Sequence, residues 1–536
     1  MVAYIYVLES KVLTTEDIDN IKMFSLRIDS KISRLASRKF RNAFQNKISL
    51  DTFYLMHRRI SRIAGIIPER YDCCINTCCM FVGEKSDLSM CPFCQQARYN
   101  ESGKARQHFD YLPLIPRLQG LFQNPEIVRL LAYRSEYTRD GNYSDIFDGD
   151  YYRDLCQTPL IIDGKDRNCY LFSGEYDLVF ALLSDGIRIF KGGHKSSATA
   201  TPFIIQLYSL PPEIRTHLQY LLPLGLAPGP HGVKDHNSFL EPFHSEMKKL
   251  AHGVQTFNCR TNNLFLLRGY LLVKIGDMID IKSNQYLKGP NGFSPCRRCR
   301  IQGCCDPSHR QSHYYFPLTA PADAVRLDYS LAKDWDPYSL PLRTEQGFKK
   351  ALKCITSAGT KKEQSRLQTV YGINGQSILV DLPGFSRIQS LPHDFMHLMF
   401  ENIIPGLVEL WSGRFKGLDE GDEDYQLPQK IWETIGEETA AASVTIPACF
   451  VSALPNIASD RHLFKAETWS FWLLYLAPHL LKGRLPDKYY DHAILLVDII
   501  KICLQFTLKP KDIDALEQMI IAWVQGYEEY VFLLPV

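Results

Sequence analysis

The distribution of cysteine constrains this chain more than any other feature of its sequence. Of 16 cysteines in 536 residues, six fall in 73–94 and four in 296–305. The first residues lack a basic region and carry too short an apolar run for a signal peptide, and no apolar run reaches the roughly 18 residues that cross a bilayer. We therefore expect an intracellular protein whose cysteines are thiols or metal ligands rather than disulfides.

The first cysteine cluster has the spacing of a structural zinc site. Its ligands are predicted to be two short-spaced pairs with a dozen residues between them, Cys74, Cys78, Cys91 and Cys94. Two such thiolate pairs can fold over one tetrahedral Zn²⁺ and fill all four of its positions. Cys73 and Cys79 adjoin the first pair, so the spacing leaves open which two of these neighbours are ligands. Unliganded core cysteines are the alternative.

The second cluster predicts another zinc site within twenty residues. Cys296 and Cys299 form a Cys-x2-Cys pair, and His309 and His313 are the expected remaining ligands. Two further cysteines compete for those last two positions, Cys304 and Cys305.

Strand patterns dominate the middle of the chain. The apolar run 177–186 predicts a buried strand, the alternating segment 187–190 a strand that pairs back on it, and 201–210 a third strand. Residues 238–250 have helical spacing, and 271–277 predicts a short strand that ends in a carboxylate. The order strand, strand, strand, helix, strand is that of an RNase H-like α/β fold.

Two aspartates end the first and the last of these strands, Asp185 and Asp277. Phosphodiester chemistry with two divalent metals needs carboxylates that converge on ions about 4 Å apart, and neighbouring strand ends of one sheet provide that convergence. A lone aspartate after a strand is common. Their joint position predicts a metal-dependent site.

A third set of polar residues lies in the apolar segment 391–402. Asp394, His397 and Glu401 are three and four residues apart, so they share one stripe of a helix. A histidine between two carboxylates indicates a metal or acid site. The alternative is that Asp394 caps the helix and the other two line a solvated face.

Helices are expected at both ends of the chain. Residues 14–65 are predicted to be helical with an N-cap at Thr14, and their basic bias, 12 Lys/Arg against six Asp/Glu in the first 62, is more typical of a solvated face than of a DNA contact. A basic helix is expected near 345–369, a loop over 414–440, and three long apolar helices from about 465 onward. The predicted divisions are a helical region 1–65, a zinc-binding module 66–110, a connection 111–173, a catalytic core 174–410 and a helical insertion 411–536.

The motifs resemble, in their order, those of the transposases of CACTA-type (En/Spm-like) DNA elements, especially the fungal forms. The resemblance runs from about Tyr71 to the C-terminus, and so many short matches in one order are not expected by chance. The matching stretches are 71–74, 91–94, 108–118, 183–186, 210–215, 226–230, 276–277, 291–299, 391–402 and 481–492.

The resemblance implies a DDE transposase with an RNase H-like core that cuts DNA at terminal inverted repeats, using Mg²⁺ or Mn²⁺, in the nucleus. Asp185 takes the place of the first catalytic carboxylate and Asp277 that of the second. By analogy with such enzymes, a homo-oligomer is expected. The net charge of +2 neither favours nor excludes a nucleic-acid partner.

The third carboxylate is where the sequence departs from the family. In the family, the polypeptide continues into a segment with a His-x3-His pair and then an acidic residue. This sequence ends at Val536 without such a segment. We therefore expect a C-terminally truncated form whose active site is incomplete. Glu401 is the competing third acid, and a non-catalytic zinc-dependent DNA- or protein-binding protein derived from a transposon is the alternative function.

Overall fold

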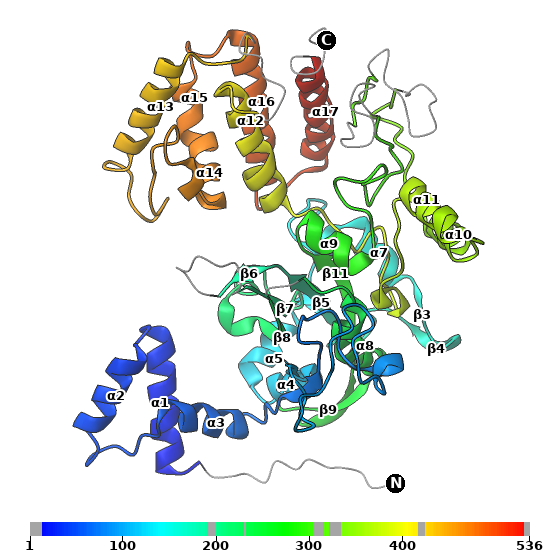
Figure 1. The fold of residues 1–536 in the computed structure, drawn as a ribbon. Helices are drawn as coiled ribbons and strands as arrows, with labels where there is room; N and C mark the ends of the chain where they lie inside the picture. The colour runs from blue at the N-terminus through cyan, green and yellow to red at the C-terminus, as the bar shows by residue number, and fades with distance from the viewer. Residues whose placement is uncertain are drawn as a thin grey trace.

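Three helices, a region of strands and a second group of helices follow one another along the chain, so the fold is mixed α/β (Figure 1). The computed structural model describes residues 13–189, 199–229, 232–304, 316–320, 334–415 and 424–529. Among the helices in these ranges, none combines the length and the apolar character that a bilayer crossing requires.

The N-terminal segment forms α1 (Thr15–Asp29), α2 (Arg34–Ala43) and α3 (Phe53–Ile63), which confirms the helical prediction for 14–65. Thr14 caps α1 as predicted. Its hydroxyl accepts the N–H of Asp17 at 3.1 Å, and the Asp17 carboxylate accepts the N–H of Thr14 at 3.0 Å.

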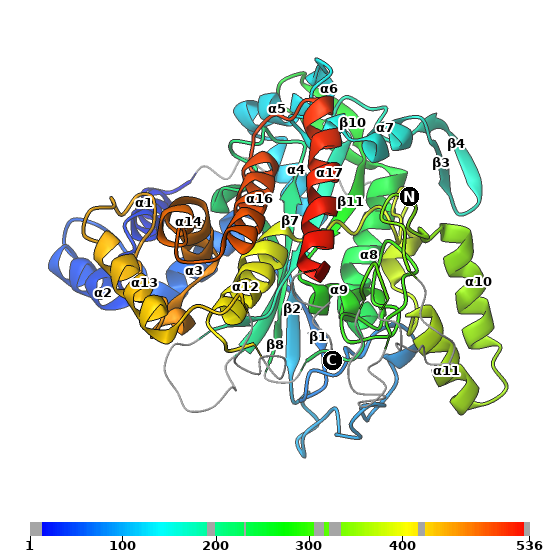
Figure 2. The ribbon, with the colours of Figure 1, turned by 90° about the horizontal axis from the view of Figure 1, so that it is seen from above.

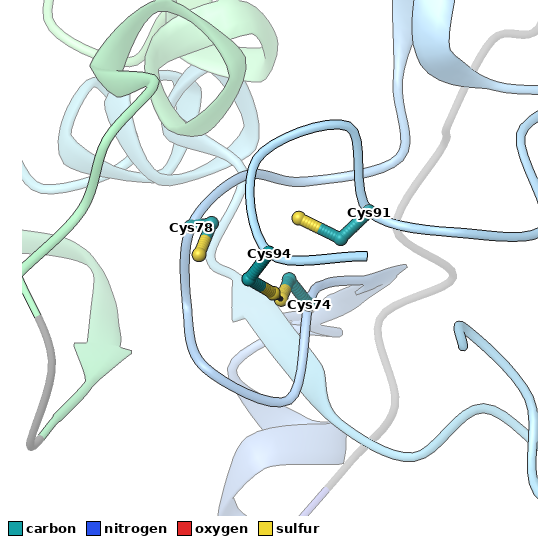
Figure 3. Close-up of side chains that lie close together, drawn as sticks. All are labelled: Cys74, Cys78, Cys91 and Cys94. Atoms are coloured by element: carbon teal, nitrogen blue, oxygen red, sulfur yellow. Dashed lines mark hydrogen bonds between the residues drawn. The ribbon is translucent and has the colours of Figure 1, made fainter. Parts of the chain in front are cut away.

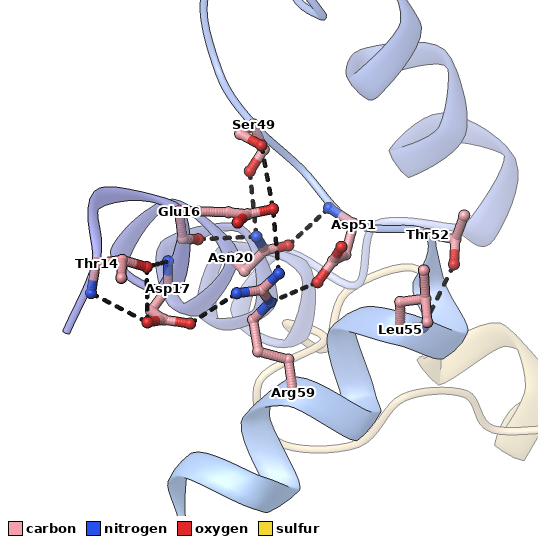
Figure 4. A network of polar contacts seen from close by, with 9 residues as sticks. All are labelled: Thr14, Glu16, Asp17, Asn20, Ser49, Asp51, Thr52, Leu55 and Arg59. Carbon is pink, nitrogen blue, oxygen red and sulfur yellow. Dashed lines mark hydrogen bonds and ion pairs between the residues drawn. The ribbon is translucent and has the colours of Figure 1, made fainter. Parts of the chain in front are cut away.

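One arginine holds α1, α3 and the segment before α3 together (Figure 4). The Arg59 guanidinium lies 3.1 Å from a carboxylate oxygen of Glu16, 2.8 Å from Asp17 and 2.6 Å from Asp51. Its hydrogen bond to Asp17 is the main cause that lowers the pKa of that carboxyl to about 2. Its single positive charge therefore offsets part of the negative charge of these three carboxylates.

Replacing Arg59 by methionine is expected to loosen α1 against α3, because three carboxylates lose their shared partner. Amide hydrogens of both helices should then exchange faster with solvent. Since the pKa of Asp17 falls from 3.8 to about 2, its contribution in the wild type is present above about pH 4 and is lost as the pH falls towards 2. The exposed neighbour Arg58 is the control, and equal exchange in the two variants would contradict the prediction.

A five-stranded sheet forms the centre of the molecule. Its strands are β5 (Leu178–Ser184), β6 (Ile187–Arg188), β7 (Thr199–Leu207), β8 (Leu222–Pro228) and β11 (Gly269–Ile275). The order is β11-β5-β7-β8, with β11 parallel to β5 and the other neighbours antiparallel, and β6 also pairs with β7.

The hairpin predicted between 177–186 and 187–190 is wrong. In the described part of 187–190, β6 pairs with β7 and extends the same ladder as β5, because Ser184 faces Phe203 and Ile187 faces Ala200. The ladder is interrupted at Asp185, which this register places opposite Pro202. Proline has no N–H to donate, so a break in pairing is expected at this position.

The near-continuous apolar run of β5 follows from burial on both faces. Leu178, Phe180 and Leu182 pack into a core that also contains Phe239 and Phe243 of α8 (His236–His252). The intervening residues of β5 belong to a second core on the other face, with Tyr152, Phe172, Tyr270 and Leu272. The helix predicted over 238–250 is thereby confirmed as α8.

The sequence patterns did not predict several of the strands. β8 contains two prolines and a glycine, and these residues obscure the sequence pattern of an edge strand. Two small hairpins lie outside the main sheet, β3 (Pro159–Ile162) with β4 (Lys165–Tyr170) and β9 (Val254–Asn258) with β10 (Asn263–Leu267). The second hairpin lies between α8 and β11, and β11 (Gly269–Ile275) confirms the strand predicted at 271–277.

The C-terminal helices have a hydrophobic core of their own. Figure 2 shows α13 and α14 on one side of the sheet and α10 and α11 on the other. The loop predicted over 414–440 is wrong in its second half, because α13 begins at Gln429 and buries Trp432 and Ile435 one turn apart. The bounds are α10 (Glu345–Thr356), α11 (Lys361–Tyr371), α12 (Ile404–Trp411), α13 (Gln429–Ala442), α14 (Ala466–Phe471), α15 (Ala477–Leu480), α16 (Asp487–Cys503) and α17 (Pro510–Tyr527).

Candidate functional site

Four cysteines gather in a cluster that could hold a metal ion such as zinc (Figure 3). The sulfur atoms of this cysteine cluster all lie within 4.8 Å of one another, and those of Cys74 and Cys94 are 3.4 Å apart. A tetrahedral Zn²⁺ with Zn–S bonds of about 2.3 Å separates its sulfurs by about 3.8 Å. The spacing therefore fits zinc. Its members are Cys74, Cys78, Cys91 and Cys94.

Two tight turns bring these sulfurs together. Thr77 and Gln95 both have positive φ, +56° and +58°, and their N–H groups donate to the carbonyls of Cys74 at 2.7 Å and Cys91 at 2.9 Å. Burial acts to raise the pKa of Cys94, but the N–H of Gln96 and the neighbouring thiols outweigh it and lower this pKa to about 6. That cysteine is therefore prepared to act as a thiolate ligand.

The two neighbouring cysteines lie outside the set. Cys73 packs into the main hydrophobic core, and the fully buried Cys79 has its sulfur 4.0 Å from that of Cys91. The cysteine-rich loops lie between β1 (Glu69–Asp72) and β2 (His108–Tyr111), which pair with each other. Tertiary packing thus decides between ligand candidates that spacing alone left open.

The cysteine-rich loops are fastened to the start of α8. The carbonyl of Cys78 accepts the N–H groups of Lys234 at 3.0 Å and Asp235 at 2.9 Å. The hydroxyl of Ser238 accepts the N–H of Met80 at 2.9 Å. Any metal that orders these loops therefore also supports the helix that packs on the sheet.

The second predicted zinc site is described only in part. Cys296 and Cys299 lie together as expected, since the N–H of Cys299 donates to the sulfur of Cys296 at 3.3 Å. Contact with Cys299 is the main cause that lowers the pKa of Cys296 to about 6. His309 and His313 lie outside the described residues, so this ligand set stays a prediction.

Asp185 and Asp277 lie at equivalent positions of adjacent parallel strands. Leu183 of β5 faces Ile275 of β11, and each aspartate follows two residues later. Parallel strands end at the same edge of a sheet, so both aspartates lie at one edge. Asp277 also caps α9 (Met278–Gln285), since its carboxylate accepts the N–H of Asp280 at 2.5 Å.

Asp280 ties the two strand ends to each other. Its carboxylate accepts the Ser184 hydroxyl at 2.7 Å and pairs with the fully buried ammonium of Lys274 at 2.6 Å. Gly276 is required beside it, because an added Cβ would overlap the Asp280 carboxylate. Burial lowers the pKa of Lys274, and the charges of Asp280, Asp277 and Asp185 act against it. Sequence reasoning missed this buried pair, although a lysine within an apolar strand was a visible signal.

His397 lies among three carboxylates, those of Asp394, Glu401 and Asp185. Nδ1 of His397 lies 2.9 Å from Asp394, and its Nε2 lies 3.7 Å from Glu401 and 4.0 Å from Asp185. Burial acts to lower the pKa of His397, but contact with Asp394 and the charges of Glu401 and Asp185 outweigh it and raise this pKa. The imidazolium therefore persists to higher pH than in a free histidine.

The backbone around His397 is a π-helix, Met396–Ile403, rather than the expected α-helix. Pro405 follows in the first turn of α12 and has no N–H to bond to the carbonyl of Glu401. This missing bond favours the wider i→i+5 pattern. The same arrangement recurs at the π-helix Trp472–Leu476, which Pro478 follows.

The carboxylates at this edge are close without forming a tight cluster. Among the described residues, the four cysteines are the only group of three or more metal-ligating side chains whose ligand atoms all lie within 4.8 Å. His397 lies between Asp185 and Glu401, while Asp277 is engaged with α9.

No protein-family model matches this chain, and a search of curated proteins found no match either.

Proposed function

We propose that this chain is a transposase-derived protein, similar to those of CACTA-type elements, whose central sheet supports metal-dependent cleavage and strand transfer at the terminal inverted repeats of DNA. The observation that carries the proposal is the pairing of β5 with β11. It sets Asp185 and Asp277 at matching positions on one edge, where His397 joins Asp185 to Glu401.

The topology of the sheet supports an RNase H-like assignment of the core. Three successive antiparallel strands, β5, β7 and β8, precede α8, and β11 then returns parallel to β5 at the opposite edge from β8. This is the arrangement in which the first and the fourth strand of that fold lie side by side and present acidic residues together.

The donor set at the edge suits a hard divalent cation. Three carboxylates lie around or near His397, and the charges of Asp394, Glu401 and Asp185 help to raise the pKa of that histidine, as expected in a negatively charged environment. In this proposal Asp185, Asp277 and Glu401 hold Mg²⁺ or Mn²⁺, which supplies activation of water and neutralisation of the phosphate. Asp394 orients His397, and His397 holds a proton between Asp185 and Glu401.

A supercoiled plasmid incubated with the full chain and Mg²⁺ or Mn²⁺ tests the proposal. We expect nicking that falls by at least about 100-fold in Asp185→Asn, because a lost metal ligand removes several kcal/mol of transition-state stabilisation. Asp154→Asn is the matched control, since that side chain is exposed and has no ion pair among the described residues.

Glu401→Gln decides the identity of the third acid. Loss of nicking comparable to that of Asp185→Asn supports Glu401 in this role, whereas unchanged nicking removes it from the acid set. If the wild type does not nick DNA with either metal, the catalytic proposal fails.

The alternative is a non-catalytic, zinc-dependent DNA- or protein-binding protein. It is favoured by the contrast between the closely gathered cysteines and the more widely spaced carboxylates. It predicts DNA binding that survives Asp185→Asn and is lost when zinc is chelated.

A further inference from the structure

We propose that α1, α2 and α3 form a second binding site, independent of the carboxylate edge, for the phosphate backbone of duplex DNA. Between these helices lies a cavity of about 370 Å³ that we call the arginine groove. Four of its lining residues are arginines, Arg27, Arg34, Arg38 and Arg41. In Figure 1 the three helices lie to one side of the sheet and away from α9, the helix that Asp277 caps.

Two arginines of the arginine groove lie over the same aromatic ring, which brings their positive charges close together. The guanidinium carbons of Arg27 and Arg34 lie 3.9 Å and 4.6 Å from the ring centroid of Phe53. Arg27 is further fixed by its hydrogen bond to the carbonyl of Ile32 at 3.1 Å. Besides burial, which is the larger cause, these two charges lower the pKa of His57. Two like charges held this close favour an anionic partner between or above them.

Three acids of the segment pair with Arg59 rather than with the arginines of the groove. Glu16, Asp17 and Asp51 are all engaged by Arg59. Within the described part of the chain, Arg34, Arg38 and Arg41 form no ion pair with any carboxylate. Asp51 lines the arginine groove but pairs with Arg59, so the three arginines of α2 have no carboxylate partner among the described residues.

The helix that carries three of these arginines is largely exposed, with Arg34 and Arg38 exposed and Arg41 half-buried. No residue of α2 is buried, and Arg34, Arg38 and Arg41 recur at spacings of four and three, so they share one face. Four residues advance an α-helix by about 6 Å, which suits guanidinium groups that contact successive phosphates of one strand. Because guanidinium binds phosphate in a bidentate manner and an exposed helix fits the major groove, duplex DNA matches this surface better than an acidic polypeptide does.

Fluorescence anisotropy with a labelled duplex of mixed sequence tests the proposal on the full, zinc-loaded chain. The variant R34Q/R38Q/R41Q is compared with K22Q/R58Q/R62Q, which removes the same charge from exposed positions outside the groove. We expect the groove variant to bind at least about tenfold more weakly and to lower the slope of log K against log salt by about 2.7, at roughly 0.9 for each lost phosphate contact. The control variant should change both quantities much less.

Three results would overturn the inference. One is equal loss of affinity in the two variants, which would indicate a general charge effect. Another is unchanged binding by the groove variant, with circular dichroism showing that both variants fold. A third is competition by poly-glutamate as effective as by unlabelled duplex of equal charge, which would assign the arginine groove to an acidic polypeptide. None of these depends on DNA cleavage, so failure of the nicking assay leaves the inference testable.

Discussion

Replacing Cys91 by serine is expected to remove one equivalent of bound zinc and to unfold the loops between β1 and β2. Cys91 is fully buried within the cysteine cluster, so its loss leaves three ligands for a site that needs four. Zinc binding in small structural sites contributes about 10–16 kcal/mol, which is comparable to or exceeds the whole stability of a typical domain. Zinc content by elemental analysis and the thermal unfolding midpoint measure the two effects.

The unfolding should spread beyond the loops themselves. Because Cys78 and Met80 bond to the first residues of α8, loss of zinc is expected to increase amide exchange at the start of that helix. Cys449→Ser, at an exposed position, is the control and should retain the zinc. Cys79→Ser is expected to retain it too, and full zinc content with unchanged melting in Cys91→Ser would rule out the assigned ligand set.

Asp280→Ala is expected to destabilise the central sheet by about 3–5 kcal/mol, because it leaves the ammonium of Lys274 buried without its carboxylate. Lys274 is 0% exposed, and among the described residues its ammonium has one other hydrogen bond, to the carbonyl of Ile275. The same substitution releases the Ser184 hydroxyl beside Asp185. Chemical denaturation measures the free energy of unfolding, with Asp154→Ala as the control.

Removing both charges tests whether the unpaired charge of Lys274 causes the loss of stability. Lys274→Met combined with Asp280→Leu should cost less than Asp280→Ala alone, since no buried charge remains unpaired. A loss below about 1 kcal/mol in Asp280→Ala would mean that Lys274 is neutral or finds water, and that the pair does not hold the strand ends.

Local patterns were sufficient for much of the secondary structure. The apolar run of β5, the helical spacing of α8 and the apolar C-terminal helices were all visible because burial imposes a period on the sequence. The same patterns failed where proline and glycine conceal an edge strand, as in β8, and they gave the wrong partner for β6, which pairs with β7 rather than with β5. The loop prediction over 414–440 failed because an acidic, polar stretch preceded the amphipathic α13.

The cysteine spacing by itself determined that a zinc-type cluster was to be expected, since a tetrahedral ion needs two pairs of thiolates and the chain has them within about twenty residues. Only the tertiary structure decided which cysteines face one another. Folding also brought Asp185, His397 and Glu401 together across more than two hundred residues, and buried Lys274 against Asp280. Sequence periodicity reports which face of an element is buried, whereas contacts between distant elements depend on how those faces pack.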